Sequence, residues 1–411
     1  MSDLKSTMVD MRSNGAPGAA AVATARCLTY NLSGVRKAVR QCIEELPDMQ
    51  DLLERTHSVL LKPNLLSSSR DPEAHVNTHP AVVQAIAELL KGEFGCDVAI
   101  GDSTGSLGTG STAKAIQISQ MDRVALMTGA TIYNVDTQPR HVVTFPDGQI
   151  YREIPLPSNL SQFDLVISVA KLKTHGLTYV TGPVKNMLGL VPGAGKRQAH
   201  LMAPRVWEFS TLLCDLYALL RPGAAFVDGV IGMEGRGPAG GSLRHVELIA
   251  ASCDPVALDS FCAEVMGFDP LTIPLLAACH ERKLGVAAPG SIVVRGEPAS
   301  AFVLPDFAKP PAYAGALLLR AVPRWLLRQT LHAFSAQYAI IDLEKCSRCG
   351  ECSRNCPSQA ISFNELSRLY QVERSKCIAC ACCAEVCPCD AVMMQGTYVR
   401  RGAQRLSSLF R

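Results

Sequence analysis

The sequence predicts a large α/β domain built on a mainly parallel sheet, followed by a small α+β domain near the carboxyl terminus. Three observations lead to this prediction. The 411-residue chain is 48% apolar, which is enough for more than one hydrophobic core. From Ala20 to about Gly296, apolar runs alternate with amphipathic stretches, as in parallel sheets whose strands are joined by helices. Beyond this region, cysteines gather in two short runs.

The alternation gives the expected elements in chain order. The expected strands are Ser58–Lys62, Asp97–Ile100, Thr131–Val135, Leu165–Val169, Ala224–Val227 and Val246–Ala251. The expected helices are Gly34–Leu46, Pro80–Lys91, Thr112–Thr128, Arg205–Leu220 and Pro255–Met266. The run Phe145-Pro-Asp-Gly-Gln-Ile150 is typical of a hairpin turn and predicts some antiparallel pairing.

The composition divides the chain into five segments. They are a flexible tail at 1–19, the α/β domain at 20–296, a linker with a basic amphipathic helix at 297–337, the small α+β domain at 338–396 and a basic tail at 397–411. Arg320, Arg324 and Arg328 share one face of the expected helix at 315–334, which Pro323 would kink or interrupt. Either this helix packs on a domain with its arginines in water, or it is a docking or membrane-surface helix.

Charge and hydropathy exclude several classes of protein. The net charge of +3 gives no reason to expect nucleic-acid binding. The polar amino terminus has no apolar signal region, and no run approaches the roughly 18 apolar residues of a membrane span. We therefore expect a soluble cytoplasmic protein without a transmembrane segment, and peripheral membrane contact is the less favoured alternative. In such a chain, the 17 cysteines indicate metal binding rather than disulfides.

The two cysteine runs repeat one metal-binding pattern. Residues 346–357 read CSRCGECSRNCP and residues 377–388 read CIACACCAEVCP, and both match C-x2-C-x2-C-x3-C-P. In this pattern three cysteines bind one [4Fe–4S] cluster and the fourth crosses to the other. The predicted ligand sets are Cys346, Cys349, Cys352 and Cys387 for one cluster, and Cys377, Cys380, Cys383 and Cys356 for the other. Zinc would favour two separated pairs of ligands instead.

Residues 338–396 resemble the two-cluster bacterial ferredoxins. That resemblance implies transfer of electrons at low potential through two [4Fe–4S] clusters. Cys382 and Cys389 lie beside the ligands but outside the pattern, as small residues near a cluster would. The seven cysteines of the α/β domain are scattered in apolar contexts and are expected to be buried free thiols.

Basic, amide and acidic residues follow several expected strands of the large domain. Ligands bind at the carboxyl ends of parallel strands, so these residues are candidates for one crevice. The candidate substrate-binding residues are Lys62, Asn64, Asp102, Lys171, Lys173, Lys185, Asn186 and Lys196, and the candidate proton donors are His79, His175 and His200. The lysines would hold a carboxylate or phosphate, and a histidine would transfer a proton. The segment from Lys171 to His200 lacks helical periodicity and is interpreted as a binding loop.

No nucleotide-binding motif is complete. The glycines from Gly101 to Gly110 follow a strand and precede a helix, where an anion-binding loop belongs, but Ser111 stands where a P-loop needs lysine. The segment Gly189 to Lys196 also fails, because its spacing is one residue too long.

The strand-end motifs resemble those of the domain of unknown function 362 family. They are Leu61-Lys-Pro-Asn64, Thr78-His-Pro80, Gly101-Asp-Ser103, Lys171-Leu-Lys-Thr-His175, Lys185-Asn186 with Gly189, Pro192-Gly193 with Lys196 and His200, and Asp254-Pro-Val-Ala-Leu-Asp259. The resemblance covers about residues 20–295 and implies a cytoplasmic iron–sulfur redox protein without specifying its reaction.

Two functions from different classes remain open. In the first, the protein is an iron–sulfur oxidoreductase that reduces a small anionic substrate held in the Lys/His crevice. In the second, it is a non-catalytic adapter that relays electrons to a redox partner protein, docking through its arginine-faced helix and basic tail. A weaker third hypothesis is that the large domain loads or senses a metal or a phosphorylated cofactor, with His175 and His200 as ligands.

Overall fold

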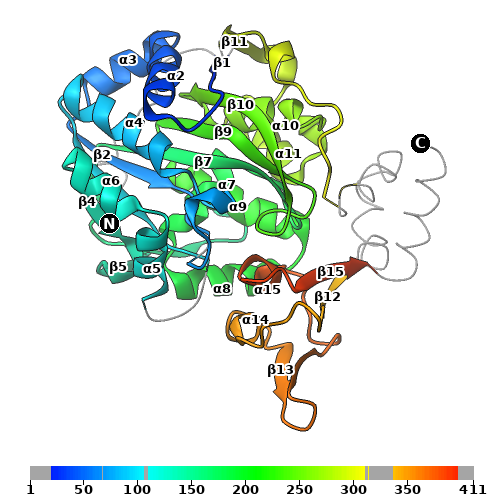
Figure 1. The fold of residues 1–411 in the computed structure, drawn as a ribbon. Coiled ribbons are helices and arrows are strands. Elements are labelled where there is room, and N and C mark those ends of the chain that lie inside the picture. Colours follow the sequence, from blue (N-terminus) through cyan, green and yellow to red (C-terminus); the bar gives the residue numbers. More distant parts are fainter. Residues whose placement is uncertain (1–19, 67, 106–109, 311–312, 314–336, 397–411) are drawn as a thin grey trace.

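The structure is a computed structural model. It describes residues 20–396 except 67, 106–109, 311–312 and 314–336. The described residues form a large α/β domain (residues 20–310) and a smaller C-terminal module (residues 337–396), which is drawn in orange and red in Figure 1. The predicted fold class is therefore confirmed. The expected tails at 1–19 and 397–411 and the expected helix at 315–334 lie outside the described residues.

A nine-stranded sheet organises the described part of the large domain. Its strand order is β11-β1-β10-β9-β7-β2-β3-β4, with β8 added to β7. The strands are β1 Ala20–Arg26, β2 Ser58–Pro63, β3 Asp97–Asp102, β4 Thr131–Asn134, β7 Leu165–His175, β8 Tyr179–Thr181, β9 Ala224–Glu234, β10 Ser242–Ser252 and β11 Ile292–Gly296. Five adjacent strands, β9, β7, β2, β3 and β4, run parallel to one another. Their carboxyl ends consequently meet at one edge of the sheet.

Helices cover both faces of this sheet (Figure 1). One face packs against α2 Leu32–Glu44, α3 Pro47–Glu54, α4 Pro80–Gly92, α5 Ser111–Ile118 and α6 Met121–Thr128. The other packs against α7 Pro183–Asn186, α9 Val206–Leu220, α10 Pro255–Val265 and α11 Pro274–Glu281, and α8 Gly193–Met202 lies towards the module. Side chains of β2 alternate between the two faces: Leu60 joins one core, and Val59 and Leu61 join the other.

The module contains two strand pairs and two short helices. Strand β12 Gln337–Ile341 pairs with β15 Val392–Gly396, and β13 Ile361–Asn364 pairs with β14 Leu369–Val372. The helices are α14 Glu351–Arg354 and α15 Cys382–Glu385. Of the two, α15 faces the large domain next to α8 (Figure 1).

Most of the expected elements are present, with some differences. The hairpin exists, since β5 Arg140–Thr144 pairs with β6 Glu153–Pro157 across the predicted turn. The expected helix Thr112–Thr128 is two helices, because Gln120 between them adopts a left-handed conformation with φ of 60°. Strands β1 and β11 and helices α3 and α11 are among the elements that the sequence pattern did not predict.

The interpretation of residues 171–200 as a loop was wrong. Strand β7 continues to His175, and α7 and α8 occupy much of the remainder. Lys171, Lys173 and His175 are almost completely buried in that strand. Charged residues can lie there because each has a polar partner, as described below, which a pattern based on hydropathy does not anticipate.

Candidate functional site

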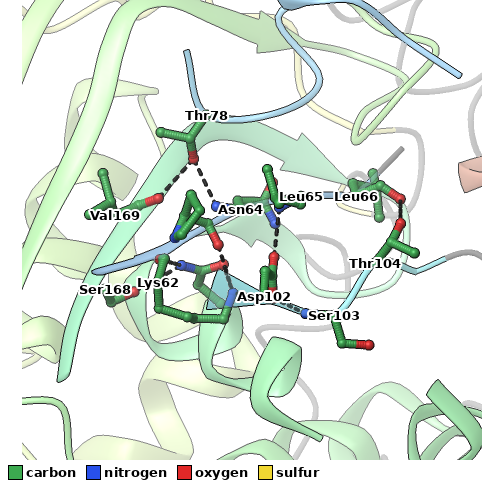
Figure 2. A network of polar contacts seen from close by, with 12 residues as sticks. Lys62, Asn64, Leu65, Leu66, Thr78, Asp102, Ser103, Thr104, Ser168 and Val169 are labelled. Atoms are coloured by element: carbon green, nitrogen blue, oxygen red, sulfur yellow. Dashed lines mark hydrogen bonds and ion pairs between the residues drawn. The ribbon is translucent and has the colours of Figure 1, made fainter. Parts of the chain in front are cut away.

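A satisfied polar network closes the carboxyl ends of β2 and β3 (Figure 2). The Lys62 ammonium lies 2.8 Å from an Asp102 carboxylate oxygen and donates to the Asn186 side-chain carbonyl, also at 2.8 Å. The other Asp102 oxygen accepts the backbone N–H of Leu65 at 2.7 Å. Gly189 is required beside this network, because a Cβ there would collide with both Asp102 and Lys62. Three predicted site residues thus hold one another in place.

Asn64 and Lys173 form a second part of the same edge. Thr78 accepts the Asn64 backbone N–H and donates to the Val169 carbonyl, both at 2.8 Å, which ties the loop after β2 to β7 (Figure 2). The Lys173 ammonium donates to the Asn64 side chain and to the Val76 carbonyl, both at 2.6 Å. Burial lowers the pKa of Lys173 well below its usual value.

Lys171 and His79 belong to a separate buried cluster. The Lys171 ammonium contacts the Tyr30 hydroxyl at 2.6 Å and Asp228 at 3.0 Å. His79 stacks on Tyr30, with ring centroids 3.7 Å apart, and its Nδ1 caps α4 by accepting the Ala81 N–H. Neither Lys171 nor His79 lines the cleft described next. Their placement indicates that they stabilise the fold.

A cleft lies between the carboxyl edge of the sheet and the C-terminal module. The predicted residues that line it are Lys62, Asn64, Asp102, Lys185, Asn186, Lys196 and His200. Other lining residues from the large domain include Thr181, Ser103 and Arg197. The module contributes Asn355, Pro357, Cys382 and Glu385. The cleft therefore brings the strand-end cations next to the cysteine-rich segments.

Several polar groups of this cleft have no partner among the described residues. The Lys185 ammonium makes no hydrogen bond or ion pair there, and burial lowers its pKa while Glu385 and Cys382 oppose that shift. The Thr181 hydroxyl and the His200 Nδ1 are buried without a hydrogen-bond partner in the described part of the chain. Buried polar groups are nearly always paired in native proteins, so this combination indicates a place for a ligand.

His200 and Lys196 differ in protonation. The His200 ring stacks on Phe209 at a centroid distance of 4.4 Å, and burial lowers its pKa to about 4. Lys196 donates to the carbonyls of Ser103 and Thr104. Burial lowers the pKa of Lys196 to about 8, against the opposing effect of Asp102. At neutral pH, His200 is consequently neutral and Lys196 is mostly charged.

His175 connects the two parts of the chain. Its Nδ1 accepts the backbone N–H groups of Leu177 and Thr178, so the proton of the neutral ring resides on Nε2. That nitrogen lies 2.9 Å from the Glu385 carboxylate of the module. Burial alone would raise the pKa of Glu385, but His175 and Lys185 lower it to about 2. His175 is thus already engaged by a carboxylate, unlike His200.

Two arginines also reach the module. Arg70 donates to the Cys387 carbonyl at 3.2 Å and to the Asp390 carboxylate at 2.6 Å. Arg197, on α8, donates to the Pro357 carbonyl through Nε at 3.3 Å and Nη2 at 3.1 Å. These contacts fix the module against the carboxyl edge of the sheet.

The cysteines of the module fall into two groups. One cavity is lined by Cys356, Cys377, Cys380 and Cys383 together with mainly apolar residues. In the second group, Cys352 is close enough to Cys387, Cys346 and Cys349 for their charges to raise its pKa, after the larger effect of burial. These two groups have the composition of the two predicted ligand sets, and four thiolates around one cavity are the donors that a [4Fe–4S] cluster needs.

The backbone of the module repeats with an offset of 31 residues. Positive φ angles occur at Arg348 (60°) and Ala379 (59°), and at Gly350 (78°) and Ala381 (66°). The cysteines that precede proline repeat as well. Ala360 N–H donates to the Cys356 sulfur at 3.2 Å, and Ala391 N–H donates to the Cys387 sulfur at 3.3 Å. Such N–H···S bonds are among the interactions that tune cluster potentials.

Comparison with protein families agrees with this architecture. Residues 59–264 match the model of the domain of unknown function DUF362, and residues 338–388 match a 4Fe-4S dicluster domain. The chain belongs to the DUF362 family. The 4Fe-4S match shows that the module is an iron–sulfur electron-transfer domain.

One curated relative and one solved structure extend the comparison. The thylakoid-associated protein sll1697 of Synechocystis sp. is 31% identical over 266 residues, which are 64% of this chain and 79% of that protein. A crystal structure of a Thermotoga maritima protein matches at 14% identity with a TM-score of 0.30, over 49% of this chain and 51% of that chain.

Sequence reasoning missed the residues that the module and α8 bring to the cleft between the sheet edge and the module. Cys382 was interpreted only as a small residue near a cluster, and Glu385 and Arg197 were not singled out. The internal repeat carried a usable signal: Cys382 and Glu385 occupy the positions of Glu351 and Arg354 in the first half. Tyr30 and Asp228, the partners of Lys171, had no motif that could reveal them.

Proposed function

We propose that this DUF362 protein is a cytoplasmic iron–sulfur oxidoreductase that reduces a small anionic substrate bound in the cleft between its two parts. The observation that carries the proposal is the joint lining of this cleft. From one side, Lys185, Thr181 and His200 contribute polar groups that have no partner among the described residues. From the other side, the cysteine-containing helix α15 contributes Cys382.

We assign two [4Fe–4S] clusters to the two cysteine groups. Cys346, Cys349, Cys352 and Cys387 would hold one, and Cys356, Cys377, Cys380 and Cys383 the other. When bound, the clusters supply single electrons received from a low-potential donor. The second group lies next to Cys382, so its cluster is the one nearest the substrate.

The cleft residues have separate roles in this proposal. Lys185 pairs with the carboxylate or phosphate of the substrate, because its ammonium has no partner among the described residues. Thr181 donates a hydrogen bond to the same ligand. The network of Lys62, Asp102 and Asn186 forms a rigid floor.

Proton supply falls to His200 or Lys196. A bound anion would raise the pKa of His200 from about 4 towards neutrality, so a proton would be taken up together with the ligand. Lys196, with a pKa of about 8, already lies near the working range of a general acid. His175 is a less suitable donor because its Nε2 proton already faces Glu385.

The experiment measures reoxidation of the reduced protein. Anaerobically purified protein is reduced with dithionite, freed of excess reductant and mixed with a panel of small carboxylates and phosphate esters. The recovery of the visible cluster absorbance, which reduction bleaches, is then followed over time. At least one compound is expected to reoxidise the wild type. Lys185→Met should lower that rate at least about tenfold, which corresponds to loss of one charge-assisted hydrogen bond.

The control is Lys37→Met, which removes an exposed lysine from α2. It should behave as the wild type does. If no compound reoxidises the protein but a redox partner protein does, and Lys185→Met is as fast as the wild type, the adapter function replaces this proposal.

No helix within the described residues is long and apolar enough to cross a membrane.

A further inference from the structure

We infer that Arg197 raises the reduction potential of the cluster nearest the cleft by placing beside it a positive charge that no carboxylate among the described residues neutralises. The inference rests on the two clusters of the proposed function. It concerns a residue of the large domain that lies outside both cysteine motifs.

The position of Arg197 is fixed by its contacts. Two of its guanidinium nitrogens donate to the carbonyl of Pro357, at 3.3 and 3.1 Å. Pro357 directly follows Cys356 and lines the same cavity as the second cysteine group. The guanidinium is thereby held within two residues of a predicted ligand of that cluster. Within the described residues, no carboxylate pairs with it.

The environment of this cluster makes such a charge important. Reduction adds one electron and hence one negative charge, which burial disfavours. Cys356, Cys380 and Cys383 are each only 7% exposed. A positive charge nearby favours the reduced form and offsets the effect of burial. On the cleft side, Lys185 and Glu385 lie near α15 and carry opposite charges.

Arg70 makes the corresponding contact with the other cysteine group but differs in charge balance. It donates to the carbonyl of Cys387, at 3.2 Å, and its guanidinium is paired with Asp390 at 2.6 Å. Removing Arg70 and Asp390 together leaves the net charge unchanged. Arg197 has no such counterion in the part of the chain that the structure describes, so its removal changes the net charge beside the buried group by one.

The test is a redox titration of the full-length protein, loaded with iron and sulfide without oxygen and followed by low-temperature EPR. In Arg197→Gln, we expect one of the two midpoints to fall. The reduced-to-oxidised ratio of that cluster at a fixed potential should decrease about tenfold, or about 59 mV for a one-electron couple. Arg197→Lys should stay near the wild type, because it keeps the charge. Arg70→Gln/Asp390→Asn should leave both midpoints within a fraction of that shift.

The inference is overturned if Arg197→Gln retains its iron but moves neither midpoint, or if Arg197→Lys shifts as far as Arg197→Gln. If Arg197→Gln loads poorly, Arg197→Ala removes the same charge with a smaller side chain, and the same two outcomes apply. The titration needs no substrate. The two proposals can therefore fail separately. If no compound reoxidises the wild type but Arg197→Gln still lowers a midpoint potential, the proposed reaction is rejected and this inference stands.

Discussion

The two halves of the C-terminal module share a backbone and differ in their surroundings. Arg348 and Ala379 have nearly equal positive φ angles, as do Gln359 and Asp390, both at 53°. Yet Cys349 of the first half is exposed, whereas its counterpart Cys380 is buried. At these positions the first half is exposed to water and the second is covered, although Asn355 and Pro357 of the first half also line the cleft.

Side chains at equivalent positions follow that difference. In the first half, Glu351 and Arg354 form an exposed ion pair at 2.7 Å. In the second half, the same positions hold Cys382 and Glu385, which line the cleft. The cysteines and the backbone turns thus repeat in the two halves, whereas the residues between the cysteines differ where the second half meets the DUF362 domain. In the proposed function, the exposed half would receive electrons and the buried half would deliver them to the ligand.

The largest expected effect comes from the cysteines of the second half. Cys380→Ser should lose the iron of one cluster, about half of the total, because a [4Fe–4S] cluster needs its four thiolates. Cys382→Ser, two residues away and outside the pattern, should keep all of it. Iron and sulfide are counted per chain in both variants and in the wild type. Equal iron loss in both variants would contradict the ligand assignment.

The next effect distinguishes two lysines of the large domain, Lys171 and Lys185. Lys171→Met leaves Asp228 without its cation in a fully buried site and should lower the free energy of unfolding by about 3–5 kcal/mol. Lys185→Met removes an ammonium that has no partner among the described residues and should leave stability unchanged or slightly raised. Denaturant unfolding of both variants provides the comparison. Similar losses in the two would show that Lys185 is structural.

Sequence reasoning succeeded where a local pattern carries the information. The hairpin between β5 and β6 followed from its turn residues, and the cysteine spacing indicated the iron–sulfur module. The strand-end rule placed seven of the predicted residues at one cleft. It could not separate Lys171 from Lys185, because the difference lies in Tyr30 and Asp228, which only tertiary packing brings to Lys171. The packing of α15 against the large domain also depends on tertiary contacts, so the sequence did not predict it.

A smaller effect concerns the attachment of the module. Glu385→Ala leaves the buried Nε2 of His175 without an acceptor and should cost about 1–3 kcal/mol of local stability. Hydrogen exchange of amides in α15 and β15 should accelerate accordingly. Arg354→Ala, at the equivalent exposed position, should cost at most about 0.5 kcal/mol. Equal protection in the two variants would show that the contact between Glu385 and His175 does not hold the module.

The last effect is a dependence of stability on pH that arises in the large domain. Burial lowers the pKa values of His75 and His79 to about 4, from 6.5. Between pH 6.5 and 4 the unfolded chain therefore binds more protons than the folded one, and stability falls as the pH is lowered through this window. His75→Asn/His79→Asn removes both groups. Asparagine suits the left-handed conformation of His75 and can cap α4 in place of His79. The thermal midpoint of this variant should decline less steeply with acid than that of the wild type, and parallel curves would exclude these two histidines as the cause.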